Sequence, residues 1–134
     1  MTGTAGGTVI LDSHGLSLHL THDREVKVLL AEALDRGMEI VVSGASLAEV
    51  AHCRVPRGRW DFALAQLLIE PMTIDRFRAA AELLRQSGLS GHKYAIDAMV
   101  AVTALEQQTP VVMLTSDVDD MAKLCRDQVT LLQV

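Results

Sequence analysis

The chain lacks the features that mark several special classes of protein. No apolar run approaches the ~20 residues that a membrane-spanning helix needs, and residues 1–7 lack the basic start and apolar stretch of a secretory signal. The 2 cysteines, Cys53 and Cys125, stand far apart, so neither a disulfide framework nor a cysteine-based metal site is expected. We therefore expect a soluble, cytoplasmic protein with no membrane partner, whose two thiols are reduced and packed in helices.

Common nucleotide-binding and nucleophile motifs are also absent. The sequence contains no Gly-x-x-x-x-Gly-Lys, Gly-x-Gly-x-x-Gly or Gly-x-Ser-x-Gly segment. It has no internal repeat and no proline- or serine-rich linker. Hydrophobic residues make up 49% of the 134 residues, which is enough for the core of one domain. We expect residues 1–7, which are small and rich in glycine, to form a flexible leader, and residues 8–134 to form a single domain.

Short apolar runs alternate with stretches of helical periodicity along the chain. Strands are predicted at residues 8–12, 39–43, 110–115 and 129–132, with a short edge strand within 70–74, around Pro71. Helices are predicted at 14–20, 25–36, 60–68, 75–86, 94–107 and 117–126, and Ser46 with Glu49 has the capping-box spacing of a further helix start. This alternation is typical of βαβ units, which form a parallel sheet with helices on both faces. The sequence therefore predicts an α/β fold.

Acidic residues follow the predicted strands. Asp12 ends the first strand, and Asp117 comes just after the strand at 110–115. Glu49 lies in the helix that follows the strand at 39–43. Because ligands of open parallel sheets gather beyond the carboxyl ends of the strands, we expect these three side chains to meet at one edge.

Asp97 stands on a helix face that is otherwise apolar, since its neighbours at i+3, i+4 and i+7 are Val100, Ala101 and Ala104. A carboxylate on such a face is costly to bury unless a cation pairs with it. Lys93, one turn earlier, is one candidate partner, and a bound metal ion is the other.

Four carboxylates at one edge would repel each other, and a hard divalent cation resolves this repulsion. Mg²⁺ and Mn²⁺ prefer carboxylate and water oxygens, and such an ion activates water and stabilises charge on a phosphate. Each acid alone also has a structural explanation, because acids cap helices and favour helix N-termini. It is their expected shared edge that predicts a site.

Four segments carry a resemblance to a known family. They are Val9-Ile-Leu-Asp12-Ser13, Ala45-Ser-Leu-Ala-Glu49-Val50, Ala95-Ile-Asp97-Ala98-Met-Val-Ala-Val-Thr-Ala104 and Leu114-Thr-Ser-Asp117-Val-Asp119-Asp120. In order and spacing they resemble the PIN domain, and most of all the VapC-like toxins of bacterial toxin–antitoxin pairs. The resemblance runs over about residues 8–134, and its Ile-Asp-Ala and Thr-Ser-Asp segments are the most specific.

The resemblance implies a three-layer α/β/α fold with a central parallel sheet, cleavage of RNA with Mg²⁺ or Mn²⁺, and a homodimer. It assigns the catalytic and metal-binding roles to Asp12, Glu49, Asp97 and Asp117. Supporting positions are Ser13, the polar pair Thr115 and Ser116, and the acids Asp119 and Asp120. His14 stands where many relatives carry Ser, Thr or Asn, which leaves the hydrogen bonding around the metal ligands open.

Basic residues and histidines allow further interpretations. The net charge of −5 disfavours phosphate binding, but three positive charges lie within six residues, at Arg54, Arg57 and Arg59. They predict either contacts with the RNA backbone or a solvated basic loop. A zinc site built from His14, His19 and His22 is conceivable, but no spaced fourth ligand supports it.

Three functions remain in competition. The leading one is a ribonuclease toxin restrained by a cognate antitoxin. The second is a housekeeping PIN nuclease that processes RNA without an antitoxin, and the third is a catalytically weak PIN domain that acts as a binding module. The intact acids at all four positions argue against the third. A short adjacent gene for a small DNA-binding protein would separate the first from the second.

Overall fold

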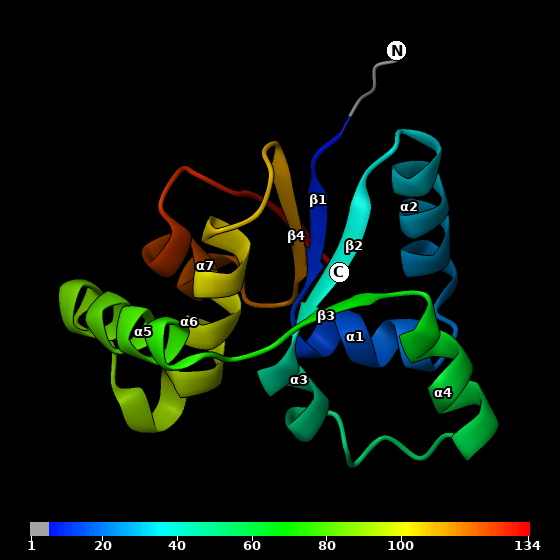
Figure 1. Ribbon diagram of the computed structural model, residues 1–134, viewed down its shortest axis with the longest axis horizontal. Helices are drawn as coiled ribbons and strands as arrows, with labels where there is room; N and C mark the ends of the chain where they lie inside the picture. Colours follow the sequence, from blue (N-terminus) through cyan, green and yellow to red (C-terminus); the bar gives the residue numbers. More distant parts are fainter. Residues whose placement is uncertain (1–5) are drawn as a thin grey trace.

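The computed structural model describes residues 6–134, in which a five-stranded parallel sheet lies between two helical layers (Figure 1). The strands are β1 (Thr8–Leu11), β2 (Glu39–Ser43), β3 (Leu68–Glu70), β4 (Val111–Thr115) and β5 (Thr130–Gln133). Their order is β3-β2-β1-β4-β5, and every neighbouring pair is parallel. The predicted three-layer α/β/α fold is confirmed. Most of the expected leader, residues 1–5, lies outside the described residues.

Helices cover both faces of the sheet (Figure 1). The helices are α1 (Ser13–Leu20), α2 (Arg24–Asp35), α3 (Gly44–Glu49), α4 (Arg57–Ala65), α5 (Ile74–Ser87), α6 (Gly91–Leu105) and α7 (Val118–Cys125). In β1, Val9 and Leu11 pack in the core with α1, α2 and α4, whereas Ile10 packs in the core with α6 and α7. Both faces of β1 are therefore buried, which explains its continuous apolar run.

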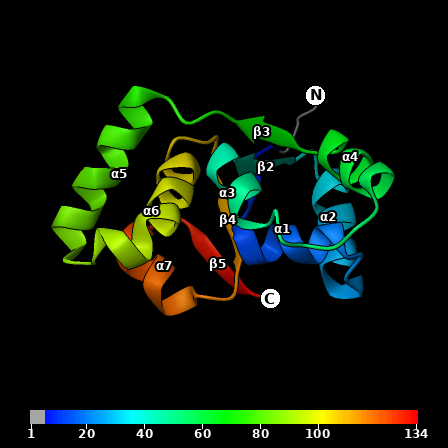
Figure 2. The same cartoon turned by 90° about the horizontal axis from the view of Figure 1, so that it is seen from below.

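The carboxyl ends of the strands meet at one edge of the sheet, which Figure 2 shows from below. Leu11 of β1 is paired with Leu114 of β4, so the residues that follow these two strands are neighbours. The short helix α3 follows β2 directly and lies over the same edge, beside α1 and α6 (Figure 2). This edge is where the sequence predicts a site.

Some local predictions are wrong. Ser43, not Ser46, caps α3, because β2 runs into the helix without a loop; the Ser43 hydroxyl accepts a hydrogen bond from Ala45 N–H at 3.2 Å. Ser46 instead lies inside the helix and is fully buried. The helical periodicity of residues 75–86 predicts that Phe77 faces the core, but 44% of its surface is exposed. None of the helices in the described part of the chain combines the length and apolarity that crossing a membrane requires.

Candidate active site

Asp12 is held rigidly where β1 meets α1. Its Oδ1 accepts a hydrogen bond from Gly15 N–H at 2.7 Å, which makes Asp12 the N-cap of α1. Burial raises the pKa of Asp12, while the Gly15 N–H and the Thr115 hydroxyl oppose this shift. A Cβ at position 15 would come within 2.9 Å of the Leu114 carbonyl oxygen, so glycine is needed for α1 to lie this close to β4. The helix start therefore fixes the Asp12 carboxylate beside the end of β4.

Asp117 is positioned by the residue that ends β4. The buried Thr115 hydroxyl accepts a hydrogen bond from Asp117 N–H at 2.9 Å, which sets the turn into α7. Although Asp117 precedes α7, its carboxylate accepts no capping hydrogen bond from the described residues of that helix. Its side chain is exposed and lines a cleft at the sheet edge. The helix-capping explanation thus does not account for Asp117.

Asp97 lies among the other acids. The helix α6 begins at Gly91, earlier than predicted, so Asp97 is in its second turn and not its first. Burial first, and then the negative charges of Asp117, Glu49, Asp12 and Asp120, raises the pKa of Asp97 to about 6. The side chains that the sequence expects at one edge therefore do influence one another there.

These acids border an open cleft of about 550 Å³ between α3, α6 and α7. Glu49, Asp97, Asp117 and Asp120 line it, while Asp119 is exposed outside it. The cleft also contains three residues that the sequence did not assign to the site: His92, Lys93 and Tyr94. The only sequence signal for them is that Lys93 lies one helical turn before Asp97.

The oxygen atoms at this sheet edge are of the kind that a hard divalent cation prefers. They belong to carboxylates, and the hydroxyl of Ser13, beside Asp12, is buried with no hydrogen-bond partner among residues 6–134. Burial and, after it, repulsion from the other acids raise the pKa of Asp97, and a bound cation would relieve that repulsion. As the side chains stand, no three acidic, histidine or cysteine groups of the described residues surround a single point. Binding would therefore require the carboxylates to turn inward.

The predicted basic residues lie outside the acid cleft. Arg54, Arg57 and Arg59 are exposed, and Arg57 borders a separate hollow next to Trp60. The Arg57 side chain is 93% exposed and lies 3.8 Å from Asp61, so this ion pair is weak. A role in RNA binding stays a prediction for these three arginines.

The histidines of α1 separate into different environments. His14 is exposed, and its positive charge lowers the pKa of Asp12, which places it near the acid site. His19 is half-buried, and its Nε2 lies 3.1 Å from the Ala63 carbonyl oxygen, so it links α1 to α4. His19 therefore has a structural partner on the far side of α1.

The family model described as the PIN domain matches residues 9–126, a range that contains all four predicted acids. No curated protein sequence matches the chain. Among solved structures, the chain is similar to VapBC2 from Rickettsia felis bound to a DNA fragment from its promoter, with a TM-score of 0.71, 19% identity, and coverage of 95% of this chain and 98% of that chain. It is also similar to a toxin–antitoxin complex from Klebsiella pneumoniae, with a TM-score of 0.68, 19% identity, and coverage of 94% and 99%. At this identity the two structures support the fold.

Proposed function

The chain belongs to the PIN domain family, and on this premise we propose that it is a metal-dependent ribonuclease, the toxin of a toxin–antitoxin pair. The observation that carries the proposal is the single cleft that Glu49, Asp97 and Asp117 line together. Burial first, and then the charges of the neighbouring acids, raises the pKa of Asp97 there to about 6. A lone acid that capped a helix would not experience the charges of four others. The catalytic and metal-binding roles are proposed for Asp12, Glu49, Asp97 and Asp117.

The four acidic side chains would have different roles in such a metal site. A bound Mg²⁺ or Mn²⁺ would supply an activated water and stabilise charge on the phosphate. Asp12, held by the Gly15 N–H, is the rigid ligand, while the exposed Glu49 and Asp117 are free to turn toward the ion. Asp97 must release the proton that its raised pKa retains, so metal binding should strengthen as pH rises through about 6.

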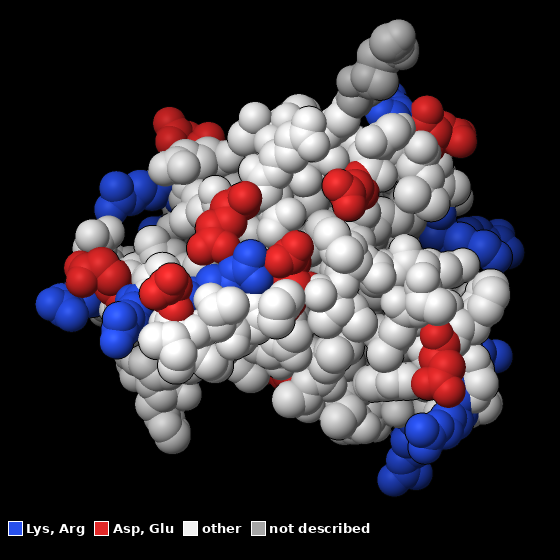
Figure 3. All heavy atoms as spheres, in the orientation of Figure 1, with Lys and Arg blue, Asp and Glu red and all other residues white. Residues whose placement is uncertain are grey.

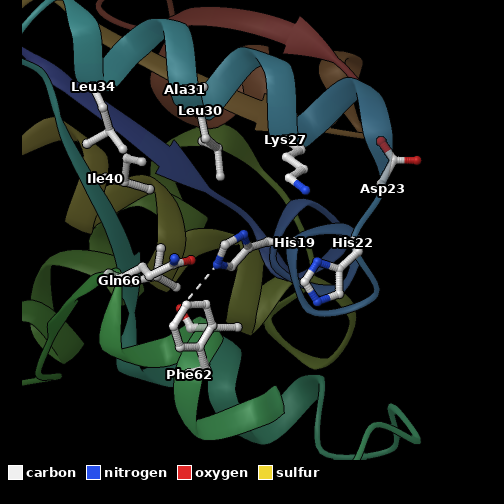
Figure 4. A pocket seen from close by; sticks show the side chains of 12 residues that line it. His19, His22, Asp23, Lys27, Leu30, Ala31, Leu34, Ile40, Phe62 and Gln66 are labelled. Carbon is white, nitrogen blue, oxygen red and sulfur yellow. Dashed lines mark hydrogen bonds between the residues drawn. The ribbon is translucent and has the colours of Figure 1, made fainter.

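An apolar groove offers a surface for the antitoxin. It has a volume of about 290 Å³ and lies between α1, α2 and α4 (Figure 4). None of the residues that line it lines the acid cleft. Phe62 and Leu34 border it with 64% and 57% of their surfaces exposed. Exposed apolar surface of this kind marks interaction sites, and one similar structure is itself a toxin–antitoxin complex. We propose that apolar side chains of the antitoxin occupy this groove.

The polar end of the groove adds a specific expectation. His19, His22 and Lys27 lie at one end of it, near Asp23 (Figure 4). A partner that presents an acidic residue next to its apolar side chains would therefore find a positive charge to pair with in Lys27.

Expression in bacteria tests the toxin assignment. The chain expressed alone should arrest growth and degrade cellular RNA, and co-expression of a small DNA-binding protein encoded next to it should restore growth. The matched control is Asp117→Asn, which should be harmless in both cases. RNA degradation by the purified protein without growth arrest, or with no effect of the neighbouring gene, would favour a housekeeping nuclease. Growth arrest by the Asp117→Asn variant would contradict the nuclease itself.

A further inference from the structure

The acid cleft has a charge problem that a metal ion solves only in part. Glu49, Asp97, Asp117 and Asp120 line it, with Asp12 buried beside it. RNA brings one further negative charge with each phosphate, and a divalent ion offsets only two of the charges present. On the face seen in Figure 3, Lys and Arg side chains lie in small groups among Asp and Glu and form no broad basic surface. A strand of RNA entering the cleft therefore needs a cation close to the acids.

Lys93 is the one Lys or Arg that lines this cleft within residues 6–134. It is exposed in the first turn of α6, one turn before Asp97. Its Nζ lies 5.1 Å from the centre of the Tyr94 ring, a distance at which the ring face attracts a cation. The aromatic ring thus limits where the ammonium group can go.

The charge of Lys93 is not taken up by the acids around it. None of the ion pairs in the described part of the chain involves Lys93, so the Lys93–Asp97 pair considered from the sequence is not formed. The Tyr94 side chain is the first cause of its raised pKa, and Asp120 and Asp117 contribute less. An ammonium group that faces the cleft without a carboxylate partner is available to an incoming anion.

We propose that Lys93, held over Tyr94 at the rim of the acid cleft, contacts a phosphate of the RNA strand and positions it for cleavage. The inference rests on the proposed ribonuclease function. It places the contact with the RNA backbone on the α6 side of the cleft. None of Arg54, Arg57 and Arg59 lines the acid cleft, and Arg57 borders a different hollow, so they do not replace this contact.

The contact has a calculable effect on RNA binding. Each phosphate contact with a single strand contributes about 0.7 to the log–log dependence of affinity on salt. Lys93→Ala should therefore lower this slope by about 0.7. With equal affinities of the two proteins at 1 M salt, the variant binds RNA about fivefold more weakly at 0.1 M salt. In cleavage assays the same variant should raise KM with a smaller change in kcat, because a phosphate grip acts on bound substrate and transition state alike.

The binding experiment uses a fluorescein-labelled 12-nucleotide single-stranded RNA and fluorescence anisotropy at several salt concentrations. Asp12→Asn serves as the background, because it is expected to block cleavage while leaving the carboxylates that line the cleft in place. The matched control is Lys123→Ala on α7, whose ammonium lies 4.0 Å from Asp120 but outside the cleft. Lys93→Arg should restore the slope, and Lys123→Ala should leave it unchanged.

The outcomes separate the contact from its alternatives. Equal slopes for Lys93→Ala and the background, or equal losses for Lys93→Ala and Lys123→Ala, would overturn the proposal. So would a weaker Mn²⁺ affinity or a lower melting temperature in Lys93→Ala, because Lys93 would then hold the carboxylates in place. Loss of a nearby positive charge alone would strengthen Mn²⁺ binding. Wild-type cleavage with an unaltered Lys93→Ala slope refutes the contact and leaves the ribonuclease standing. A Lys93-dependent slope in a protein that cleaves no RNA supports the contact and refutes the ribonuclease.

Discussion

Metal-free Asp97→Asn should be more stable than metal-free wild type at neutral pH. The substitution keeps the shape of the side chain and removes the charge that burial and four neighbouring acids disfavour. Folding raises the pKa of this carboxyl from 3.8 to about 6. At about 1.4 kcal/mol per pKa unit, the ionised carboxylate destabilises the folded protein by about 3 kcal/mol. Because Asp97 is only half-buried, solvent screening reduces this to on the order of 1–2 kcal/mol. For a domain of this size that is about 3–8 °C in melting temperature.

The pH dependence has a definite sign. The folded protein holds the Asp97 proton more tightly than the unfolded chain, so the destabilisation is absent below pH 3.8 and complete above about pH 6. The amide that replaces this carboxyl in Asp97→Asn does not titrate, and the other groups titrate in both proteins. The gap between the two melting temperatures should therefore be widest above pH 6 and close as pH falls toward 4.

Paired melting curves of wild type and Asp97→Asn, in EDTA and in Mg²⁺, test whether Asp97 is a metal ligand. Mg²⁺ should stabilise the wild type by RT ln(1 + [L]/Kd) and stabilise Asp97→Asn much less, since a ligand is lost. Lys93 does not reverse the sign, because it forms no ion pair with Asp97 among the described residues. A lower metal-free melting temperature for Asp97→Asn, with an undiminished Mg²⁺ response, would refute the reasoning and make Asp97 a structural residue.

Three further predictions concern packing, substrate and assembly. Gly15→Ala should cost about 1–3 kcal/mol and impair cleavage, because its Cβ would push against the Leu114 carbonyl beside Asp12; Gly58→Ala, in α4 with no described atom within 4 Å of its Cβ, should be neutral or stabilising, and equal melting temperatures for the two variants would contradict this. Simultaneous replacement of the three exposed arginines after α3 by Ala should flatten the salt dependence of RNA binding, and an unchanged slope would leave a solvated loop. Light scattering should give twice the chain mass, and one chain's mass over a wide concentration range would exclude the homodimer. The arginines in question are Arg54, Arg57 and Arg59.

The sequence predicts the central strands well because their burial is nearly complete. β1, β2 and β4 lie within the sheet and are covered on both faces, so their apolar runs are continuous. The edge strand β3 has only three residues, two of them exposed, and is defined by its pairing with β2. That pairing joins residues far apart in the chain, such as Val41 and Leu68, which local pattern does not reveal. The predicted strand around Pro71 accordingly begins too late, and the helix before it is α4 at Arg57–Ala65.

The acids of the site are predictable for the same topological reason. Residues that follow parallel strands reach one edge whatever the side chains between them, so Asp12 and Asp117 could be placed from their positions alone. The exposure of Phe77, the cleft-facing Lys93 and the apolar groove depend on how helices rotate about their axes and pack on one another. Periodicity does not determine that rotation for helices with apolar residues on more than one face.

RNA cleavage by the purified protein tests the central claim most directly. A labelled single-stranded RNA and a single-stranded DNA of the same sequence are incubated with wild type in Mg²⁺, in Mn²⁺ and in EDTA. Asp12→Asn, Asp97→Asn and Asp117→Asn are purified in parallel, so that a contaminating nuclease would appear in every sample. We predict cleavage of RNA only by the wild type, its loss in EDTA and its recovery when Mg²⁺ or Mn²⁺ is restored in excess. Undiminished cleavage by Asp97→Asn with metal present, or by the wild type in EDTA, would contradict the account of a carboxylate-held metal site.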